Sequence, residues 1–520
     1  MYFNPQSESF KVAINSPVYV DKTLLLEALN MVLRTEGRCV SLSHARRFGK
    51  SQAAGMIDAY YNKAMDSREL FAPFKIAKCA DFEKHLNKYN VIHLDISTVA
   101  DFYKEDLIEQ VTKNVYGDMR ESFPDVDYDA PINKVLSDIY SLTGTPFVII
   151  IDEWDCVVRN HADRPDLVHR YMQFLHAMFK SEESKSFLAL GYITGILPVK
   201  KIKDESALNN FVEYTMVNSR NLTEFYGFTE DEVKDLCEKH DLNFESVRKW
   251  YNGYLINGKH MYNPNSVYQA IQFKSIESYW KNTSSFDTIN TFITMNFDGL
   301  KDDIISIMKG GKVYVDTTTF LNDLSEIGSK DNALTALIHL GYLGYDADRG
   351  MAYMPNYEVS EAFQLAIKTG GWKELADALK NSLLLLNATI DGEEEKVAEY
   401  IELAHEAWTS VLKYNDENSL ASTILMAYYS SQAYYDIIRE LPTGKGFADL
   451  TSLPRKEANG RPAILVELKW DKDADSALRQ IHERHYAGEL QSYSDEIVLV
   501  GINYDKKTKR HACKIERYRK

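Results

Sequence analysis

Short runs of apolar residues alternate with helical patterns along the first 220 residues of the chain. Residues 147–151 are consecutive apolar positions between a Gly-Thr-Pro segment and two acids, which is typical of a buried parallel strand. Residues 38–42 and 187–193 predict two further strands, and residues 51–63 predict a helix. Strands that alternate with helices indicate a three-layer α/β domain.

After Phe228 the pattern becomes mainly helical, and Thr229 is the predicted N-cap of a helix with acids in its first turn. Residues 312–316 predict a short strand, residues 331–339 a helix, and residues 341–355 a hairpin with alternating aromatics. This order is similar to a winged helix. Because the predicted helix is almost free of basic residues, we expect it to pack inside the protein and not to read a DNA groove.

The C-terminal part is predicted as helices followed by a second α/β region. Helical patterns fill residues 372–440. Beyond them the sequence predicts a helix near residues 475–485 and strands at residues 447–453, 462–470 and 496–504.

Composition narrows the class of protein. The 520 residues are enough for two to four domains. The apolar runs are far shorter than the ~20 residues of a membrane helix, and the N-terminus lacks a signal-peptide pattern. Five scattered cysteines without a C-x-x-C pair argue against a disulfide framework or a cysteine zinc site. We therefore expect a cytoplasmic protein without a membrane partner.

Basic residues gather at the C-terminus, although the whole chain has a net charge of −16. The final fifteen residues hold eight Lys or Arg side chains and one acid. This asymmetry predicts that the C-terminal end meets a polyanion. A solvated basic tail is the alternative.

A phosphate-binding loop is predicted between the first strand and its helix. The segment HARRFGKS begins at His44 and ends in Gly49, Lys50 and Ser51, the end of a Walker A motif. Such a loop binds phosphate through backbone N–H groups, a lysine and a hydroxyl that ligates Mg²⁺. His44 replaces the first glycine of the motif, so the turn must be made differently.

The same segment contains Arg46, Arg47 and Phe48. The two arginines are predicted to clamp phosphates of the bound nucleotide or of a neighbour's nucleotide. The alternative is that they are ordinary exposed loop residues.

An acid pair follows the strand at residues 147–151. Asp152 is predicted to hold the magnesium-bound water, and Glu153 to polarise the attacking water. Alone, the pair could equally mark a helix N-terminus, but a loop and acids at two strand ends favour a nucleotide site. Thr194, at the end of the next strand, is either a γ-phosphate sensor or a turn residue.

A second group of charged residues lies in the C-terminal α/β region. Glu467 and Lys469 share one face of a predicted strand, and Asp449 lies on the strand before it. Two carboxylates can bind Mg²⁺ or Mn²⁺ while the lysine orients a water for phosphodiester attack. Glu440, at the end of the preceding helix, completes the acidic cluster, and Gln480 braces it. The alternative is a buried Glu–Lys–Asp salt-bridge network.

These motifs together resemble the bacterial AAA-ATPase-like proteins with a C-terminal PD-(D/E)XK nuclease domain. Besides the C-terminal acids and lysine, the motifs that carry the resemblance are residues 19–23 (YVDKT), 46–51 (RRFGKS), 151–155 (IDEWD), 194–196 (TGI), 206–211 (SALNNF), 227–230 (GFTE), 250–254 (WYNGY), 262–264 (YNP), 279–283 (YWKNT) and 341–343 (GYL). The family's loop usually reads RPRRFGKS and also lacks the first Walker glycine, so His44 does not imply an inactive ATPase.

The resemblance implies an α/β architecture, use of Mg²⁺-ATP, and a nuclease. The expected parts are an AAA-like P-loop ATPase with a helical subdomain (residues 1–285), a winged-helix-like region (286–365), a helical connector (366–414) and a restriction-endonuclease-like PD-(D/E)XK domain (415–520). The expected partner is nucleic acid, with DNA preferred, in defence or mobile-DNA maintenance. The rival hypothesis is a nucleotide-switched scaffolding protein that binds nucleic acid without cutting it. The sequence leaves the oligomeric state open.

Overall fold

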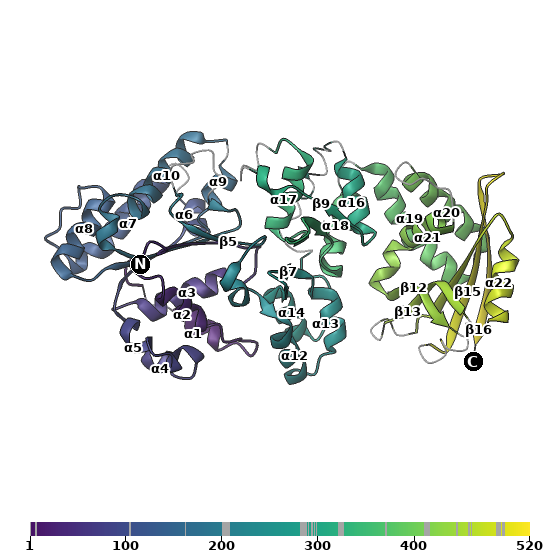
Figure 1. The fold of residues 1–520 in the computed structure, drawn as a ribbon, viewed down its shortest axis with the longest axis horizontal. Helices are drawn as coiled ribbons and strands as arrows, with labels where there is room; N and C mark the ends of the chain where they lie inside the picture. The colour runs from purple at the N-terminus through teal and green to yellow at the C-terminus, as the bar shows by residue number, and fades with distance from the viewer. Residues whose placement is uncertain are drawn as a thin grey trace. The chain divides into compact units, whose positions relative to one another are not determined.

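The computed structural model describes residues 2–5, 8–102, 106–161, 163–199, 208–280, 289, 291–292, 295, 297, 299–320, 327–369, 372–409, 417–443, 446–455, 458, 460–484, 490 and 494–519. Some predicted motif residues, 206–207, 281–283 and Lys520, lie outside this part. The chain forms two compact units (Figure 1). The N-terminal unit comprises Met1–Tyr279 and Lys312–Val359, and the C-terminal unit comprises Trp280–Gly311 and Ser360–Lys520.

A parallel five-stranded sheet forms the centre of the N-terminal unit. Its strand order is β2-β3-β4-β1-β5, with β1 (Cys39–Ser43), β2 (Asn90–Asp95), β3 (Phe147–Asp152), β4 (Leu188–Gly195) and β5 (Val212–Thr215). Every residue of β1, β3 and β4 is buried. Strands covered on both faces are expected to be apolar throughout, which explains the continuous runs in the sequence.

Helices cover both faces of this sheet. The helices around it are α1 (Glu8–Ile14), α2 (Leu24–Asn30), α3 (Lys50–Tyr61), α4 (Arg68–Phe71), α5 (Phe82–His85), α6 (Ile96–Phe102), α7 (Leu107–Ser122), α8 (Ile132–Thr143), α9 (Cys156–Asn160), α10 (Pro165–Phe179) and α11 (Ser184–Phe187). In β3, Ile149 and Ile151 pack with α7, α8 and α10, whereas Val148 and Ile150 pack with α2 and α3. The predicted three-layer α/β arrangement is confirmed.

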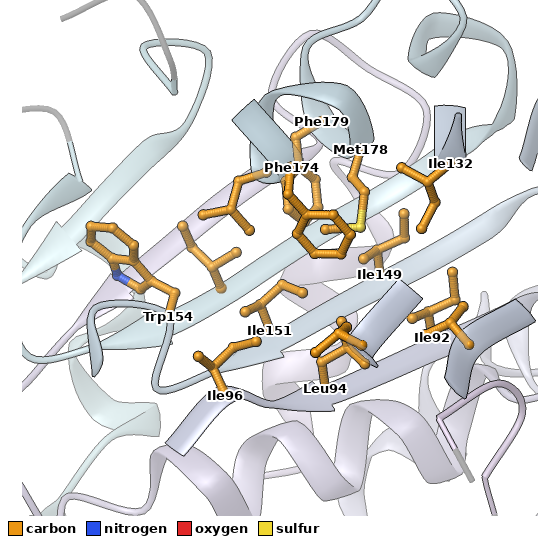
Figure 2. Close-up of a cluster of buried hydrophobic side chains, with 14 of the residues drawn as sticks. Ile92, Leu94, Ile96, Ile132, Ile149, Ile151, Trp154, Phe174, Met178 and Phe179 are labelled. Carbon is orange, nitrogen blue, oxygen red and sulfur yellow. The ribbon is translucent and has the colours of Figure 1, made fainter. Parts of the chain in front are cut away.

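Figure 2 shows one of these faces. Side chains of β2 and β3 meet those of α10 there: Ile92, Leu94, Ile149, Ile151, Phe174 and Met178. The alternation of side chains along each strand thus supplies two cores from one sheet.

Two small antiparallel sheets follow in the N-terminal unit. The first has the order β6-β8-β7 and the second β10-β11-β9. Their elements are β6 (Phe228–Thr229), α12 (Glu230–Lys239), α13 (Phe244–Tyr251), β7 (Tyr254–Ile256), β8 (Lys259–Tyr262), α14 (Pro264–Phe273), β9 (Lys312–Tyr314), α17 (Lys330–Leu340), β10 (Gly344–Asp346) and β11 (Met351–Tyr353). The predicted cap is confirmed, because Thr229 and Glu232 form a reciprocal capping box at the start of α12.

Helix α17 and the strands β9, β10 and β11 form the winged-helix-like element. Residues 333–340 of α17 are all buried, which fits a helix that packs inside the protein. The chain passes into the C-terminal unit within α18 (Tyr357–Thr369). The predicted boundaries at residues 285, 365 and 414 stay predictions.

The C-terminal unit is built on a mixed sheet of order β12-β13-β14-β15-β16, in which only the β14–β15 pair is parallel. The elements are α16 (Leu300–Met308), α19 (Lys373–Asp391), α20 (Glu394–Thr409), α21 (Glu417–Ala427), β12 (Tyr435–Thr443), β13 (Gly446–Pro454), β14 (Ala463–Trp470), α22 (Ala474–Glu483), β15 (Glu496–Asp505) and β16 (Arg510–Arg519). Because β14 and β15 are parallel, α22 is the crossover between them.

One prediction and one alternative for this unit were wrong. Residues 435–440 are in strand β12 and not in a helix, because they pair with β13. The basic C-terminus is strand β16 and not a free tail, because Arg510–Arg519 pair along β15. Charged residues are common on an edge strand, where they discourage pairing with other chains.

All five cysteines are free. Within the described parts of the chain, we find no helix long and apolar enough to cross a bilayer.

Candidate functional site

The predicted phosphate loop connects β1 to the N-terminus of α3. Gly49 is the N-cap of α3 and has a φ of 85°, a left-handed conformation that favours glycine. Lys50 and Ser51 form the first turn of the helix. Helix N-terminal N–H groups therefore face the position where a phosphate binds in such loops.

Phe48 anchors the loop in the protein core. Its ring is fully buried and packs edge-on against Tyr254, with 5.2 Å between ring centroids. Gly227 donates its N–H to the Phe48 carbonyl at 3.1 Å, and a Cβ on Gly227 would lie 3.1 Å from the Phe48 ring. The close approach at Gly227 explains why the GFTE motif begins with glycine.

His44 occupies the position of the missing glycine and is buried. Its Nε2 lies 2.6 Å from Ser219 Oγ, which donates to the Thr215 carbonyl at 2.7 Å. Ser219 Oγ thus accepts a hydrogen bond from His44 Nε2–H. Burial, and then the nearby Lys50, lower the pKa of His44 to about 3. The histidine is therefore a neutral hydrogen-bonding anchor for the start of the loop.

Lys50 lies beneath the loop, with its side chain buried. Its Nζ donates to the carbonyls of His44 and Ala45 at 2.9 and 3.0 Å. Burial lowers the pKa of Lys50, and the carboxylates of Glu153 and Asp152 oppose that shift. The lysine is held between its own loop and the acid pair.

Other loop residues contact the C-terminal half of the N-terminal unit. The Asn263 side chain donates to the Arg46 carbonyl at 3.3 Å, and the Arg47 guanidinium donates to the Tyr279 carbonyl at 3.4 Å. Asn263 also caps α14. The loop is thus fixed through backbone and side-chain contacts to the YNP and YWKNT motifs.

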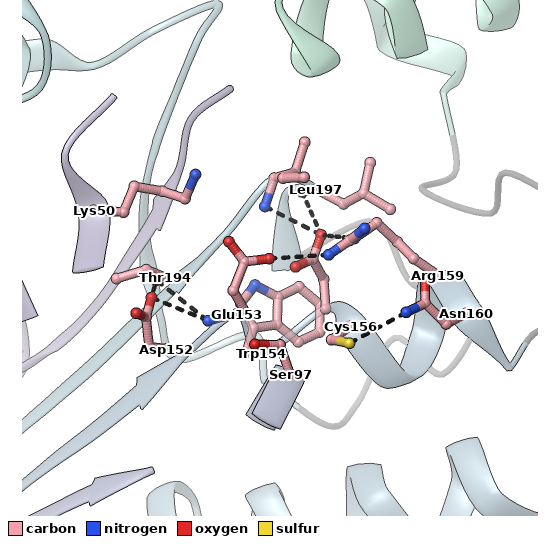
Figure 3. Close-up of polar contacts among 12 residues, drawn as sticks. Lys50, Ser97, Asp152, Glu153, Trp154, Cys156, Arg159, Asn160, Thr194 and Leu197 are labelled. Atoms are coloured by element: carbon pink, nitrogen blue, oxygen red, sulfur yellow. Dashed lines mark hydrogen bonds and ion pairs between the residues drawn. The ribbon is translucent and has the colours of Figure 1, made fainter. Parts of the chain in front are cut away.

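The acid pair lies at the end of β3, as predicted. Thr194 Oγ1 donates a short hydrogen bond to Asp152 Oδ1, which also accepts from the Glu153 N–H at 3.1 Å (Figure 3). The Thr194 hydroxyl is therefore used to orient Asp152. Burial raises the pKa of Glu153, while Lys50 opposes the shift.

Sequence reasoning missed Arg159, which binds Glu153. Its Nη2 lies 3.0 Å from Glu153 Oε2, and its Nε lies 2.9 Å from Asp155 Oδ2. The same Asp155 oxygen accepts the N–H groups of Ile196 and Leu197 at 3.1 and 2.9 Å (Figure 3). The only sequence signal was the four-residue spacing of Asp155 and Arg159 across one helical turn.

These residues surround a pocket of about 1000 Å³. The lining includes Arg46, Arg47, Phe48, Gly49, Lys50, Ser51, Asp152 and Glu153. Its other walls include Val18, Tyr19, Phe228, Pro264 and Tyr268. The predicted phosphate loop and several apolar side chains thus line one pocket, a combination that would suit a nucleoside phosphate.

The second predicted group lies in the C-terminal unit. Glu467 and Lys469 are buried on β14, and Lys469 Nζ lies 3.0 Å from Glu467 Oε1. Gln480 on α22 donates a short hydrogen bond to the same oxygen. Asp449 on β13 accepts the Leu468 N–H at 2.7 Å. The predicted residues Asp449, Glu467, Lys469 and Gln480 are thus brought together.

Glu467 has the electrostatics of a metal ligand. Its Oε2 is buried without a hydrogen-bond partner among the described residues. Burial and the neighbouring Asp449 raise its pKa to about 7, although Lys469 acts in the opposite direction. A buried orphan oxygen beside a second carboxylate fits a divalent cation, which would satisfy the oxygen and stabilise the ionised form.

Glu440 lies in β12, but its side chain is outside the described part of the structure. Several basic groups of β16 are paired within the unit. Arg517 and Arg519 contact Glu496 at 2.8 and 3.1 Å, and Lys514 contacts Glu394 at 2.9 Å. The charge of the C-terminus is therefore partly neutralised.

Comparisons with known proteins agree with the division into an N-terminal unit built on a parallel sheet and a C-terminal unit built on a mixed sheet. Residues 8–203 match the family model described as predicted AAA-ATPase, and residues 415–513 match the PD-(D/E)XK nuclease superfamily. An "Uncharacterized protein in vnfD 5′ region" from Azotobacter chroococcum mcd 1 is 21% identical over 94% of this chain and 93% of that protein.

Among solved structures, the ORC2 protein of Aeropyrum pernix, in ADPNP and ADP complexes, aligns with 71% of this chain and 99% of that chain. The identity is 10% and the TM-score 0.31, a value below that of chains with a common fold. The family matches and the two sheets agree with a P-loop-type α/β domain followed by a restriction-endonuclease-like α/β domain. In one polypeptide, the chain thus joins a segment that matches the predicted AAA-ATPase family model to a segment that matches the PD-(D/E)XK nuclease superfamily model.

Proposed function

We propose that the protein is a Mg²⁺-dependent ATPase whose nucleotide state controls a metal-dependent nuclease. One observation carries this proposal: each unit contains a buried lysine near two acids, which lie at the end of β3 in the N-terminal unit and within β13 and β14 in the C-terminal unit. In the N-terminal unit these are Lys50, Asp152 and Glu153. In the C-terminal unit they are Lys469, Asp449 and Glu467.

In the ATPase site, Lys50 exchanges its two carbonyl contacts for the outer phosphates of ATP. Ser51 and Asp152 would hold Mg²⁺, which neutralises developing charge on the phosphates. Glu153 is the group that accepts a proton from the attacking water. Because Arg159 holds Glu153, we infer that the glutamate must leave Arg159 to reach that water.

In the nuclease site, Asp449 and Glu467 would hold Mg²⁺ or Mn²⁺, which supplies a Lewis acid and lowers the pKa of a bound water. Lys469 lies beside Glu467 and orients the nucleophile or stabilises the negative phosphate. Gln480 donates to one Glu467 oxygen, and the second, unpartnered oxygen would be the one to bind the metal. Glu440 stays a predicted member of this cluster.

For the nucleic acid, we propose contact with the turn between β15 and β16. Lys506, Lys507, Lys509 and Arg510 are exposed there. Lys469 lies opposite Asn503, which is near the end of the parallel strand β15. The turn that follows β15 therefore lies at the same end of the sheet as the proposed nuclease site. Phosphate contacts from this turn would position a DNA backbone without reading its sequence. Defence or mobile-DNA maintenance is the proposed setting.

Two pairs of variants test the proposal. We expect Lys50→Ala to lose ATP binding, and Glu153→Gln to keep binding but to lose hydrolysis by orders of magnitude. Plasmid and single-stranded DNA are then incubated with Mg²⁺ or Mn²⁺, with and without ATP. Asp449→Ala should abolish cleavage and retain DNA binding, whereas Glu483→Ala, at an exposed position on α22, should cleave normally.

Equal ATP binding by the wild-type protein and Lys50→Ala would refute the ATPase site. DNA binding by the wild-type protein without cleavage in any metal would refute the nuclease and support the rival scaffolding function.

A further inference from the structure

A second group of metal-ligating side chains lies in the C-terminal unit. Glu402 and His405 are on α20, and His511 is on β16. One ligand atom from each residue lies within 4.8 Å of the other two. The proposed nuclease site uses none of these residues.

Hydrogen bonds hold the His511 ring in a defined orientation. Its side chain is fully buried. Both its backbone N–H and its Nδ1 contact Glu402 Oε2, at 3.1 and 2.8 Å. In the metal-free chain the Glu402 carboxylate accepts from Nδ1–H. A metal ion at this position would replace that proton, so that Nδ1 and Glu402 Oε2 could bind the same ion.

His405 completes the group from one helical turn away. The Glu-x-x-His spacing places Glu402 and His405 on the same face of α20. The His405 and His511 rings lie with centroids 5.1 Å apart at an angle of 86°. The two imidazoles thus come from different elements, α20 and β16, and lie close together, as two histidine ligands of one metal ion do.

This group and the nuclease site lie on opposite faces of the sheet. Trp470 and Tyr504 pair in the parallel register, and the Tyr504 ring is 4.9 Å from both the Trp470 and His511 rings. Lys469, the residue before Trp470, faces Glu467. Since successive side chains on a strand point to opposite faces, β14 separates the two sites.

We propose that Glu402, His405 and His511 bind a divalent transition metal, with zinc the best match. Two imidazoles and one carboxylate form a typical zinc ligand set, whereas Mg²⁺ and Ca²⁺ prefer oxygen ligands alone. The ion joins α20 to the edge strand β16, and a water or a further group fills the fourth position. This inference does not depend on ATPase or nuclease activity.

The test uses Zn²⁺ alone with the full-length chain. The protein is stripped with a chelator and equilibrated with Zn²⁺ at neutral pH, and bound zinc is measured by elemental analysis across a titration. Asp449→Ala/Glu467→Ala serves as the background, so that zinc at the nuclease acids does not contribute. In this background we expect one high-affinity equivalent.

Two partly exposed ligands are replaced first, in Glu402→Gln and His405→Gln, because a change at buried His511 risks misfolding. Each should weaken zinc binding by more than about tenfold while circular dichroism stays unchanged. The matched control is His482→Gln, a half-exposed histidine of α22 that contacts Glu516, which should bind zinc normally. Cobalt substitution adds an independent readout, since visible bands of tetrahedral Co²⁺ should disappear in His405→Gln.

Zinc binding of equal strength in the background and in His405→Gln would overturn the proposal. The absence of a high-affinity equivalent in the background would overturn it as well, and would leave the three residues as a hydrogen-bonded contact between α20 and β16.

Discussion

Replacing Glu467 by Gln should stabilise the metal-free protein at alkaline pH. The pKa of Glu467 rises from an ordinary value of 4.5 to about 7, because the carboxyl is buried and lies near Asp449. Between these values the folded chain holds a proton that the unfolded chain has lost. Stability therefore falls as the pH rises through this window, and the loss is complete above pH 7.

The size of the effect follows from the shift. One pKa unit corresponds to about 1.4 kcal/mol, so the ionised Glu467 costs the folded state about 3 kcal/mol. A glutamine has almost the shape of a protonated glutamate and keeps an acceptor oxygen for Lys469. Glu467→Gln should thus match the wild-type protein near pH 5 and exceed its unfolding free energy by up to about 3 kcal/mol near pH 8.

Calorimetric and urea unfolding of the full chain in a chelator, across this pH range, measure the difference. Glu483→Gln, at an exposed position on α22, is the control and should show no such trend. Added Mn²⁺ should stabilise the wild-type protein at high pH, because the metal binds the ionised carboxylate, and should stabilise the variant much less.

The opposite sign at high pH would refute this reasoning. If Glu467 serves mainly as the ion-pair partner of Lys469, its loss leaves a buried ammonium unpaired. Glu467→Gln would then be less stable than the wild-type protein near pH 8 by several kcal/mol.

Three other substitutions test the packing and charge networks of the N-terminal unit. Phe48→Ala removes a buried ring from its contact with Tyr254, and urea denaturation should show a loss of about 3–5 kcal/mol. A loss below about 1 kcal/mol would mean that Phe48 does not anchor the loop. Arg159→Ala leaves buried Asp155 with two backbone donors and no cation, so we expect a fall of about 3–5 kcal/mol and a lower melting temperature. Unchanged melting would show that the ion pair is not a stabilising contact. Thr229→Ala removes the capping box of α12 and should cost about 1 kcal/mol, with ATP hydrolysis as the unchanged control measurement.

The pattern of apolar residues predicted the strands that are buried on both faces. The run at residues 147–151 became β3, because a strand covered on both faces is apolar throughout. By contrast, β12 and β16 are half-polar strands that exist through pairing with β13 and β15. Their partners are adjacent in the sequence and were predicted as strands. However, β12 and β16 carry many charged residues, so an apolar pattern alone could not identify them.

The candidate sites show the same limit. The elements that carry Lys50, Asp152 and Glu467 could be predicted, because each residue lies in or next to a strand with a clear apolar pattern. Arg159 was missed, since an acid and an arginine four residues apart on a helix are common at any surface. Arg159 contacts Glu153, and Glu153 has a left-handed backbone conformation with a φ of 52°. The sequence does not predict this conformation.

The carboxylate of Asp155 links the backbone that follows β4 to the side chain of Glu153. One of its oxygens holds the backbone after β4 and, through Arg159, the side chain of Glu153. In the proposed ATPase, withdrawal of Glu153 toward bound ATP would therefore change the charge balance at the N–H groups of Ile196 and Leu197. Linkage is reciprocal. A partner that binds the segment after β4 and favours one position of Arg159 must alter ATP affinity by the same factor by which ATP alters the affinity for that partner.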